Sequence, residues 1–502
     1  MNLKSIKTLG ELKSSGYKTK SIKDEMRENL ICFLKKGENP FDGIIGYDNT
    51  VIPELQTAIL SRHNIILLGL RGQAKTKIAR LMINLLDEYI PVIDGSELND
   101  DPFNPLSVIA KQKIIEDGDN TKINWLPRED RYTEKLATPD VSVADLIGDV
   151  DPIKAASLKL PYSDERVIHF GLIPRSHRSI FVINELPDLQ ARIQVALFNI
   201  LEERDIQIRG FKVRMPLDIQ FVFTANPEDY TNRGSIVTPL KDRIDSQILT
   251  HYPKNVEHSR LITAHEANLA NDQKNQIKAG DLMKELIELI AFEARESEYV
   301  DEKSGVSARL TISAYENLIS TAERRNLLNN EKETQLRVSD LFGVFPSITG
   351  KIELVYEGEQ EGPYKVAQIL IGKAIRKYFG KLFPSPDNLK KTETVSPYQP
   401  IIQWFQKGNK FDLLSELSND DYKRKLKSVP GVKKVVDKYH PKEDADTKYL
   451  LMEFILFGLS EHSLLSRSRM ENGIQFKDMI SSMFSMSSDD EPGIDDSSLF
   501  RE

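Results

Sequence analysis

Cysteine is almost absent from this sequence of 502 residues, which contains only Cys32. A single cysteine forms neither a disulfide within the chain nor a cysteine-rich zinc site, so those scaffolds are excluded and a reducing compartment is expected. Long apolar runs are also missing, because the longest, 449–459, is interrupted by Glu453 and is too short to cross a bilayer. Residues 1–17 hold no apolar stretch of signal-peptide length. We therefore expect a soluble, cytoplasmic protein.

Positive charge is not in excess either. The chain has 68 Lys and Arg against 76 Asp and Glu, a net charge of −8, and its basic clusters are short, such as 423–427. Such a surface repels nucleic acid and anionic lipid, so we expect neither as a partner.

Strand-like and helix-like patterns alternate along the first half of the chain. The apolar run 64–69 is followed by helical spacing over 78–85, and further apolar strands follow at 179–184 and 219–224. This alternation predicts an α/β fold with a parallel sheet and crossover helices. The expected organisation is an N-terminal helical arm (1–42), the α/β domain (43–250), a helical bundle (251–335), a mainly helical accessory region (336–480) and a disordered acidic tail (481–502).

The strand at 64–68 leads directly into Gly-Leu-Arg-Gly-Gln-Ala-Lys-Thr at 69–76. Gly69 and Gly72 permit tight curvature, Lys75 offers a cation to the β- and γ-phosphates, and Thr76 offers a hydroxyl to Mg²⁺. Ala74 stands where the standard P-loop has its last glycine, and its methyl group crowds the turn if a positive φ is needed. The alternative is a glycine-containing helix start with a solvated Lys75.

Two further strands end in polar residues. The strand 180–184 has the form of a Walker B strand, in which Glu185 would polarise the attacking water and Asn184 replaces the usual aspartate of the Mg²⁺ shell. Asn226 ends the next strand, where it can bind the attacking water or the γ-phosphate. The alternatives are a helix N-terminal charge for Glu185 and an Asn-Pro turn for Asn226.

Two arginines are candidates for charge stabilisation. Arg243 lies between two aspartates, and Arg309 begins a helix in the bundle. Taken singly each has a structural interpretation, but their order after the motifs above favours a role in phosphoryl transfer.

Residues from about 43 to 320 resemble the AAA+ ATPases, in particular the branch of the magnesium chelatase ATPase subunit and the MoxR proteins. The resemblance is carried by Ile45-Gly46, by the MoxR-like loop end Gln73-Ala74-Lys75-Thr76, by 146–152 around Asp149, by 170–179 and by the strands described above.

This resemblance implies ATP and Mg²⁺ as cofactors and a role for each motif. It implies an adenine pocket at Ile45 and Gly46, phosphate binding by Gly69, Gly72, Gln73, Ala74, Lys75 and Thr76, and Mg²⁺ at Thr76 and Asn184. It further implies catalysis by Glu185, sensor 1 at Asn226, an arginine finger for the neighbouring subunit at Arg243, and sensor 2 on a helical lid at Arg309. Residues 141–175 would form an insert within helix 2, and 205–214 a pre-sensor-1 hairpin.

The family usually assembles as a hexameric ring and commonly works with a protein that carries a von Willebrand A domain. We therefore expect an ATP hydrolase that remodels a protein partner, with turnover reduced by Asn184. Two alternatives stay open: the ATPase subunit of a magnesium or cobalt chelatase, and an ATP-gated scaffold with weak hydrolysis.

Overall fold

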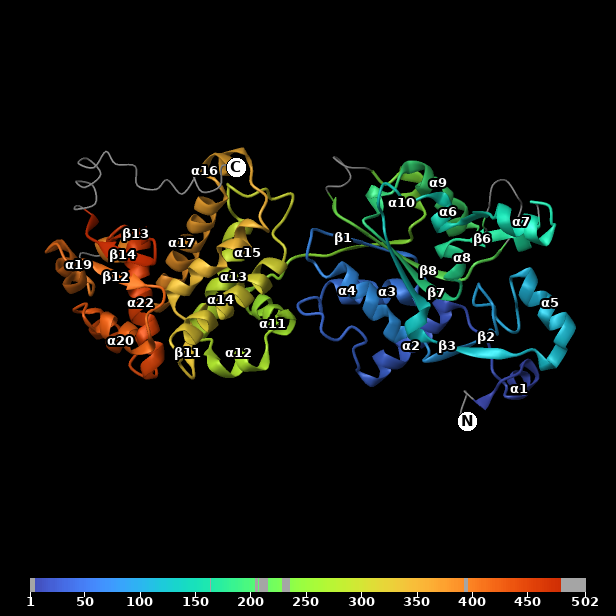
Figure 1. Ribbon diagram of the computed structural model, residues 1–502, viewed down its shortest axis with the longest axis horizontal. Helices are drawn as coiled ribbons and strands as arrows, with labels where there is room; N and C mark the ends of the chain where they lie inside the picture. Colours follow the sequence, from blue (N-terminus) through green and yellow to red (C-terminus); the bar gives the residue numbers. More distant parts are fainter. Residues whose placement is uncertain are drawn as a thin grey trace. The chain divides into compact units, whose positions relative to one another are not determined.

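A parallel sheet of five strands forms the centre of the first half of the chain (Figure 1). The computed structural model describes residues 5–162, 164–203, 206, 215–227, 235–391 and 396–479, and it divides the chain into two compact units, Met1–Tyr252 and Pro253–Glu502. In the first unit the strand order is β4-β7-β8-β1-β9, and all neighbours are parallel. The strands are β1 (Ile65–Leu68), β4 (Tyr132–Leu136), β7 (Ser179–Asn184), β8 (Ile219–Ala225) and β9 (Ser246–Leu249).

Both faces of this sheet are covered by helices, which explains why its strands are continuous apolar runs. Successive side chains alternate between the faces, so Ile65 and Leu67 belong to one apolar cluster and Ile66 and Leu68 to the other. The first cluster includes α2 (Ile22–Lys36), α3 (Val51–Leu60) and α4 (Lys75–Leu81); the second includes α9 (Ala191–Glu202) and α10 (Thr238–Asp242). The predicted α/β class with crossover helices is confirmed.

Helix α2 is part of this core. Its residues Ile22, Met26 and Leu30 are buried in the same cluster as the strand residues. The segment 1–42, which we expected as an arm, is therefore built into the first unit through the apolar face of α2.

The stretch 141–175, where we expected an insert, contains a pair of short strands with three short α-helices among its described residues. Strands β5 (Gly148–Val150) and β6 (Ile168–Phe170) pair antiparallel around α7 (Pro152–Leu158), between α6 (Val143–Leu146) and α8 (Leu172–Arg175). The hairpin expected at 205–214 lies outside the described residues, apart from Ile206.

A second small element was not expected. Strands β2 (Tyr89–Ile93) and β3 (Ile123–Pro127) pair antiparallel, with α5 (Val108–Asp117) between them, and α1 (Leu9–Ser14) is anchored beside them. The Trp125 indole donates to the carbonyl of Ile6 at 2.9 Å. The β2–β3 pair lies between β1 and β4 in the chain. It therefore lengthens the connection between these two strands of the parallel sheet.

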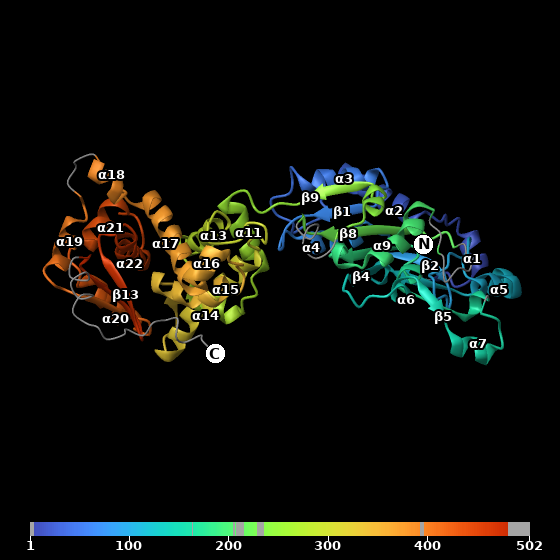
Figure 2. The same ribbon diagram turned by 90° about the horizontal axis from the view of Figure 1, so that it is seen from above.

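The second unit has one continuous hydrophobic core, from Ile277 to Phe476. Helices α13 (Asp281–Arg295), α17 (Pro363–Leu382) and α22 (Ala445–Glu461) contribute long apolar faces to it. Figure 2 shows α17 between the helices that precede it in the chain and those that follow. The expected bundle (251–335) and accessory region (336–480) therefore share a core. The larger helices are α11 (Val256–Glu266), α13 (Asp281–Arg295), α14 (Arg309–Leu328), α17 (Pro363–Leu382), α19 (Gln399–Gln406), α20 (Asn419–Lys427), α21 (Val432–Tyr439) and α22 (Ala445–Glu461).

Shorter elements complete this unit. They are α12 (Asn271–Gln276), α15 (Phe345–Thr349), α16 (Tyr356–Glu361), α18 (Pro386–Lys391), the 3₁₀ segment η8 (Val338–Val344), the parallel pair β10 (Ile277–Lys278) and β11 (Thr334–Gln335), and the antiparallel sheet of β12 (Phe411–Leu414), β14 (Gly473–Lys477) and β13 (Ser466–Met470). Within the described ranges of both units, every helix is too short or too polar to cross a membrane. The tail expected at 481–502 lies outside those ranges.

Candidate nucleotide site

The loop between β1 and α4 has the curvature that its glycines suggest. A Cβ at Gly69 would lie 1.9 Å from Oγ1 of Thr250, so no larger residue fits there without movement. Gly72 has φ +71°, and Ala74 has φ +57° and ψ +15°, in the left-handed region. The crowding expected at Ala74 is thus present, since an L-residue in this region costs about 1–2 kcal/mol.

Lys75 is the first residue of α4, and its side chain turns back over the loop. Only 8% of the residue is exposed. Its ammonium donates to the carbonyls of Gly69 and Leu70, the latter at 3.0 Å, and to Oδ1 of Asn226 at 2.8 Å. The cation is therefore held where the loop and the end of β8 meet, among oxygen acceptors that a phosphate can replace.

Asn226 connects this lysine to Glu185. Its Nδ2 donates to Oε2 of Glu185 at 3.3 Å, while its Oδ1 accepts from Lys75. Strands β1, β8 and β7 are neighbours and parallel, so their carboxyl ends deliver the three side chains to one edge. Glu185 has φ +55° and ψ +50°, a second left-handed non-glycine residue at this edge, and its N–H donates to the Thr224 hydroxyl at 3.2 Å.

Asn184 is buried at the end of β7 and uses both atoms of its amide. Its Oδ1 accepts from the Thr224 hydroxyl at 3.1 Å, and its Nδ2 donates to Oε1 of Glu134, on β4, at 2.7 Å. Glu134 was not among the predicted site residues. A single acid in a half-buried strand gives no local signal, and only the pairing of β4 with β7 reveals its position.

The segment that contains Ile45 and Gly46 is fastened to the loop by Tyr47, which was also not among the predicted site residues. The Tyr47 hydroxyl lies 3.0 Å from the carbonyl of Gln73 and 2.7 Å from that of His251. Burial raises the pKa of Tyr47 to about 12, so the hydroxyl stays a donor. The Gln73 side chain is itself fixed, because its Oε1 accepts from Thr250 at 2.7 Å. Residues 45–47 therefore border the loop, where the adenine pocket is predicted.

The donor set fits a magnesium ion that arrives with a nucleotide. In the described part of the chain, no group of three or more His, Cys, Asp or Glu side chains could hold a metal on its own. Mg²⁺ usually takes one or two protein oxygens and completes its shell with phosphate and water. The hydroxyl of Thr76 in the first turn of α4, with the oxygens of Asn184 and Glu134, meets that requirement in chemical type.

Arg243 lies directly after α10 and away from the loop. It donates to Oε2 of Glu202 at 2.7 Å and to the carbonyl of Pro239 at 2.8 Å. Asp245 then caps the start of β1 by accepting from the N–H of Asn64 at 2.8 Å. The chain therefore enters β9 at the amino-terminal edge of the sheet, where β1 begins. Lys75 lies at the opposite, carboxyl-terminal edge.

Arg309 belongs to the second unit. It is the exposed first residue of α14, and its N–H donates to the Ser307 hydroxyl at 3.1 Å. Its role as sensor 2 stays a prediction.

No protein-family model matches the chain, and no curated protein matches it in sequence. Among solved structures, the chain is similar to the complex of subunits BchI and BchD of magnesium chelatase, with 18% identity over 64% of this chain and 98% of that chain and a TM-score of 0.34. It is similar to a RuvB mutant from Thermotoga maritima, with 11% identity over 76% and 96% and a TM-score of 0.36. It is also similar to NtrX from Brucella abortus in complex with ADP, with 14% identity over 66% and 62% and a TM-score of 0.34. Because these sequence identities are below 25% and the TM-scores are below 0.5, the similarities carry no functional argument. The function has to be argued from the site itself.

Proposed function

We propose that this protein is an AAA+ ATPase that binds and hydrolyses ATP at the loop 69–76. The observation that carries the proposal is the hydrogen-bonded series Lys75–Asn226–Glu185 at the carboxyl edge of three adjacent parallel strands. Ligands of open α/β sheets bind at this edge, and an ammonium, an amide and a carboxylate are the groups that phosphoryl transfer to water requires.

Each group has a distinct task in this proposal. Lys75 exchanges its contacts with the loop carbonyls for the β- and γ-phosphates. Glu185 accepts the proton of the attacking water, and Asn226 holds that water or the γ-phosphate in line. Mg²⁺, when bound with ATP, supplies neutralisation of the phosphate charge, with Thr76 and Asn184 as its protein contacts.

Calorimetric titration with ATP, together with steady-state ATPase assays, tests this site. Lys75→Ala should abolish binding, whereas Glu185→Gln should keep binding and lower turnover by about 10²–10⁴-fold, the range of a general base. A folded preparation that gives no heat with adenine nucleotides would refute the proposal.

We further propose that the active form is an oligomeric ring, with a hexamer as the expected size, that remodels a protein partner. Support comes from Arg243, which lies at the opposite end of β1 from its own loop and is therefore suited to act on a neighbouring subunit. Arginine fingers contribute about 10³–10⁵ in turnover. Arg243→Ala should lower turnover to that extent without loss of ATP binding, and Arg128→Ala, which removes another surface arginine of the same unit, is the matched control.

Sizing with and without ATP, combined with a pull-down, tests the ring and its partner. A partner with a von Willebrand A domain is the expected class. A monomer that hydrolyses ATP at the full rate, insensitive to Arg243→Ala, would contradict the ring.

An ATP-gated scaffold with weak hydrolysis is the second candidate, favoured by Asn184 in place of the Walker B aspartate. It predicts ATP-dependent assembly with wild-type turnover no faster than that of Glu185→Gln. The chelatase-subunit alternative shares the same site and differs in its partners, so assays with tetrapyrrole, metal and candidate partner subunits test it.

A further inference from the structure

A carboxylate stands next to the position where the Walker B aspartate is missing, but it comes from another strand. Glu134 of β4 accepts a hydrogen bond from Nδ2 of Asn184 at 2.7 Å. In the parallel register Leu136 is opposite Asn184 and Glu134 is opposite Val182. Because side chains alternate with a period of two, Glu134 and Asn184 share one face and lie within reach as diagonal neighbours.

The Glu134 carboxylate also contacts Arg80, in the last turn of α4, and Tyr132, on its own strand. Arg80 donates to it from Nε at 3.0 Å and from Nη2 at 3.2 Å, and the Tyr132 hydroxyl lies 3.0 Å from its Oε2. Burial and the nearby Glu134 raise the pKa of Tyr132, so its hydroxyl donates. Arg80 follows Thr76 by four residues, and the two therefore occupy the same face of α4. Glu134 thus lies on the side of the helix that carries the Thr76 hydroxyl.

We propose that Glu134 supplies, from the adjacent strand, the negative charge that Asn184 lacks, and that it acts as a positioning residue for the magnesium–nucleotide complex. The inference rests on the nucleotide site proposed above. It makes Asn184 and Glu134 a coupled pair, in which the amide binds the carboxylate and the pair carries a single negative charge.

The same geometry explains why an aspartate is unfavourable at position 184. Two carboxylates at the 2.7 Å separation of this hydrogen bond would repel each other, and one would take up a proton. Asn184→Asp alone should therefore add little. The ion pair between Glu134 and Arg80 does not explain why Glu134 also contacts Asn184. The Arg80 side chain is 63% exposed, and a surface ion pair forms without a third partner.

The experiment is a titration of the full chain with a fluorescent ADP analogue, in EDTA and in a series of Mg²⁺ concentrations. Glu134→Gln preserves the shape of the side chain and an acceptor for Asn184, and it removes only the charge. We expect unchanged affinity in EDTA and a loss of about 10-fold or more in the tightening that Mg²⁺ produces, the range found for residues that support metal ligands. The double variant Glu134→Gln/Asn184→Asp, which moves the carboxylate to β7, should restore that tightening.

Two control variants give the opposite or no effect. Tyr132→Phe removes one hydrogen bond and keeps the carboxylate, so the Mg²⁺ response should stay that of the wild type. Arg80→Gln removes the counter-cation and should strengthen the response; it also serves if Glu134→Gln fails to fold. Electron paramagnetic resonance of Mn²⁺ in the ADP complex provides a second measurement that does not depend on turnover.

A wild-type Mg²⁺ response in Glu134→Gln, or a double variant no better than Glu134→Gln, would overturn the role of Glu134 and leave the nucleotide site intact. A wild-type chain that binds no nucleotide even in EDTA would instead remove the site itself.

Discussion

Ala74 and Glu185 are the two residues of the candidate site that hold a left-handed backbone without being glycine. Such conformations cost about 1–3 kcal/mol each and persist where the surrounding structure enforces them. Ala74 is followed directly by Lys75, and Glu185 follows the last residue of β7. The strain thus lies at the two points where the chain turns to present a charged side chain.

Ala74→Gly should therefore raise the free energy of unfolding of the first unit by about 0.5–1 kcal/mol. Glycine removes the penalty of the positive φ, and the larger entropy of the unfolded chain offsets part of this gain. The chain has two tryptophans, Trp125 in the first unit and Trp404 in the second, so denaturation followed by Trp125 fluorescence in a Trp404→Phe background reports on the first unit.

Ala79→Gly is the control for this change. Ala79 is a buried residue inside α4, and glycine there should lower the free energy of unfolding by about 1 kcal/mol. Equal effects of the two substitutions would contradict the argument from φ.

His177 determines part of the acid stability of the first unit. It is buried, its Nδ1 accepts from the N–H of Asp218 at 3.0 Å, and burial, together with the Arg178 cation, lowers its pKa to about 3. The unfolded histidine binds a proton below about pH 6.5, and the folded one does not until about pH 3. The contribution of the neutral His177 to the free energy of unfolding is therefore complete above pH 6.5, and it is lost as the pH falls toward 3.

His177→Gln should remove about 1.4 kcal/mol per pH unit from the decline in stability below pH 6.5. Denaturation at pH 7, 6 and 5, followed by Trp125, measures this slope, and substitution of the exposed His169 is the control. An unchanged slope in His177→Gln would show that this histidine takes up its proton in the folded state as well.

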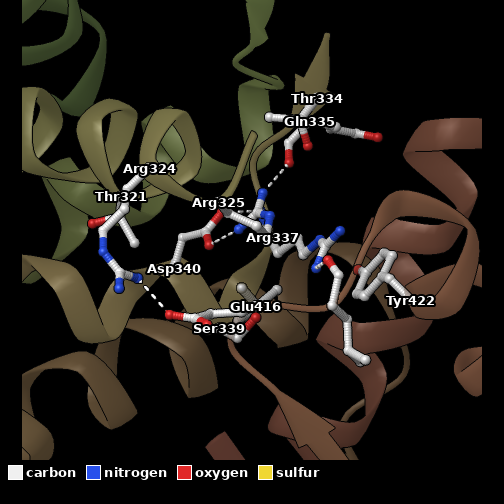
Figure 3. A network of polar contacts seen from close by, with 12 residues as sticks. Thr321, Arg324, Arg325, Thr334, Gln335, Arg337, Ser339, Asp340, Glu416 and Tyr422 are labelled. Atoms are coloured by element: carbon white, nitrogen blue, oxygen red, sulfur yellow. Dashed lines mark hydrogen bonds and ion pairs between the residues drawn. The ribbon is translucent and has the colours of Figure 1, made fainter. Parts of the chain in front are cut away.

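At the scale of elements, buried polar contacts link η8 to helices of the second unit, and Figure 3 shows the part of this network around Arg325 and Asp340. Arg325 of α14 pairs with Asp340 of η8, and their side chains are 2% and 4% exposed. On α22, Glu453 accepts from the N–H groups of Val338 and Ser339 and from the Tyr422 hydroxyl of α20, each at 2.8 Å. The 3₁₀ segment η8, which also buries Val338, Leu341 and Val344, is thus fixed by buried polar contacts as well as by apolar packing.

Arg325→Gln should lower the free energy of unfolding of the second unit by about 3–5 kcal/mol, because it leaves the buried Asp340 without its counter-charge. The adjacent Arg324 is a matched control, since its pair with Glu416 joins side chains that are 67% and 56% exposed. Arg324→Gln should change stability by less than about 1 kcal/mol. Denaturation followed by Trp404 fluorescence distinguishes the two, and similar losses would mean that burial does not set the strength of this pair.

At the scale of the whole molecule, the chain consists of two units with separate hydrophobic cores. The sheet and the loop 69–76 belong to the first unit, and Arg309 belongs to the second. We therefore expect two unfolding transitions, one reported by Trp125 and one by Trp404.

ADP should raise only the Trp125 transition, by about 2.7 kcal/mol at a concentration of 100 times its Kd, because a ligand stabilises the state that binds it. The Trp404 transition should not move, since the contact expected of Arg309 is with the γ-phosphate, which ADP lacks. Lys75→Ala should abolish the shift. Coincident transitions that ADP moves together would contradict the independence of the two units.

The sequence by itself determined the order of the chemical groups: a glycine-containing loop after an apolar strand, Glu185 after a second strand and Asn226 after a third. These predictions succeed because strand, loop and helix signals are local, and because parallel strands end at one edge of a sheet. The same signals correctly predicted the α/β class, whereas the insert at 141–175 was implied only by the family resemblance.

Only the tertiary structure decided which distant residues meet. Glu134 beside Asn184, Tyr47 against the loop, α2 within the first core, and one core shared by 277–476 all depend on contacts between segments far apart in the chain. Alternation along a strand shows which face a side chain takes, but not which strand lies next to it. Which strands and helices become neighbours depends on the apolar surface that the whole unit buries. The sequence of a single segment therefore does not determine it.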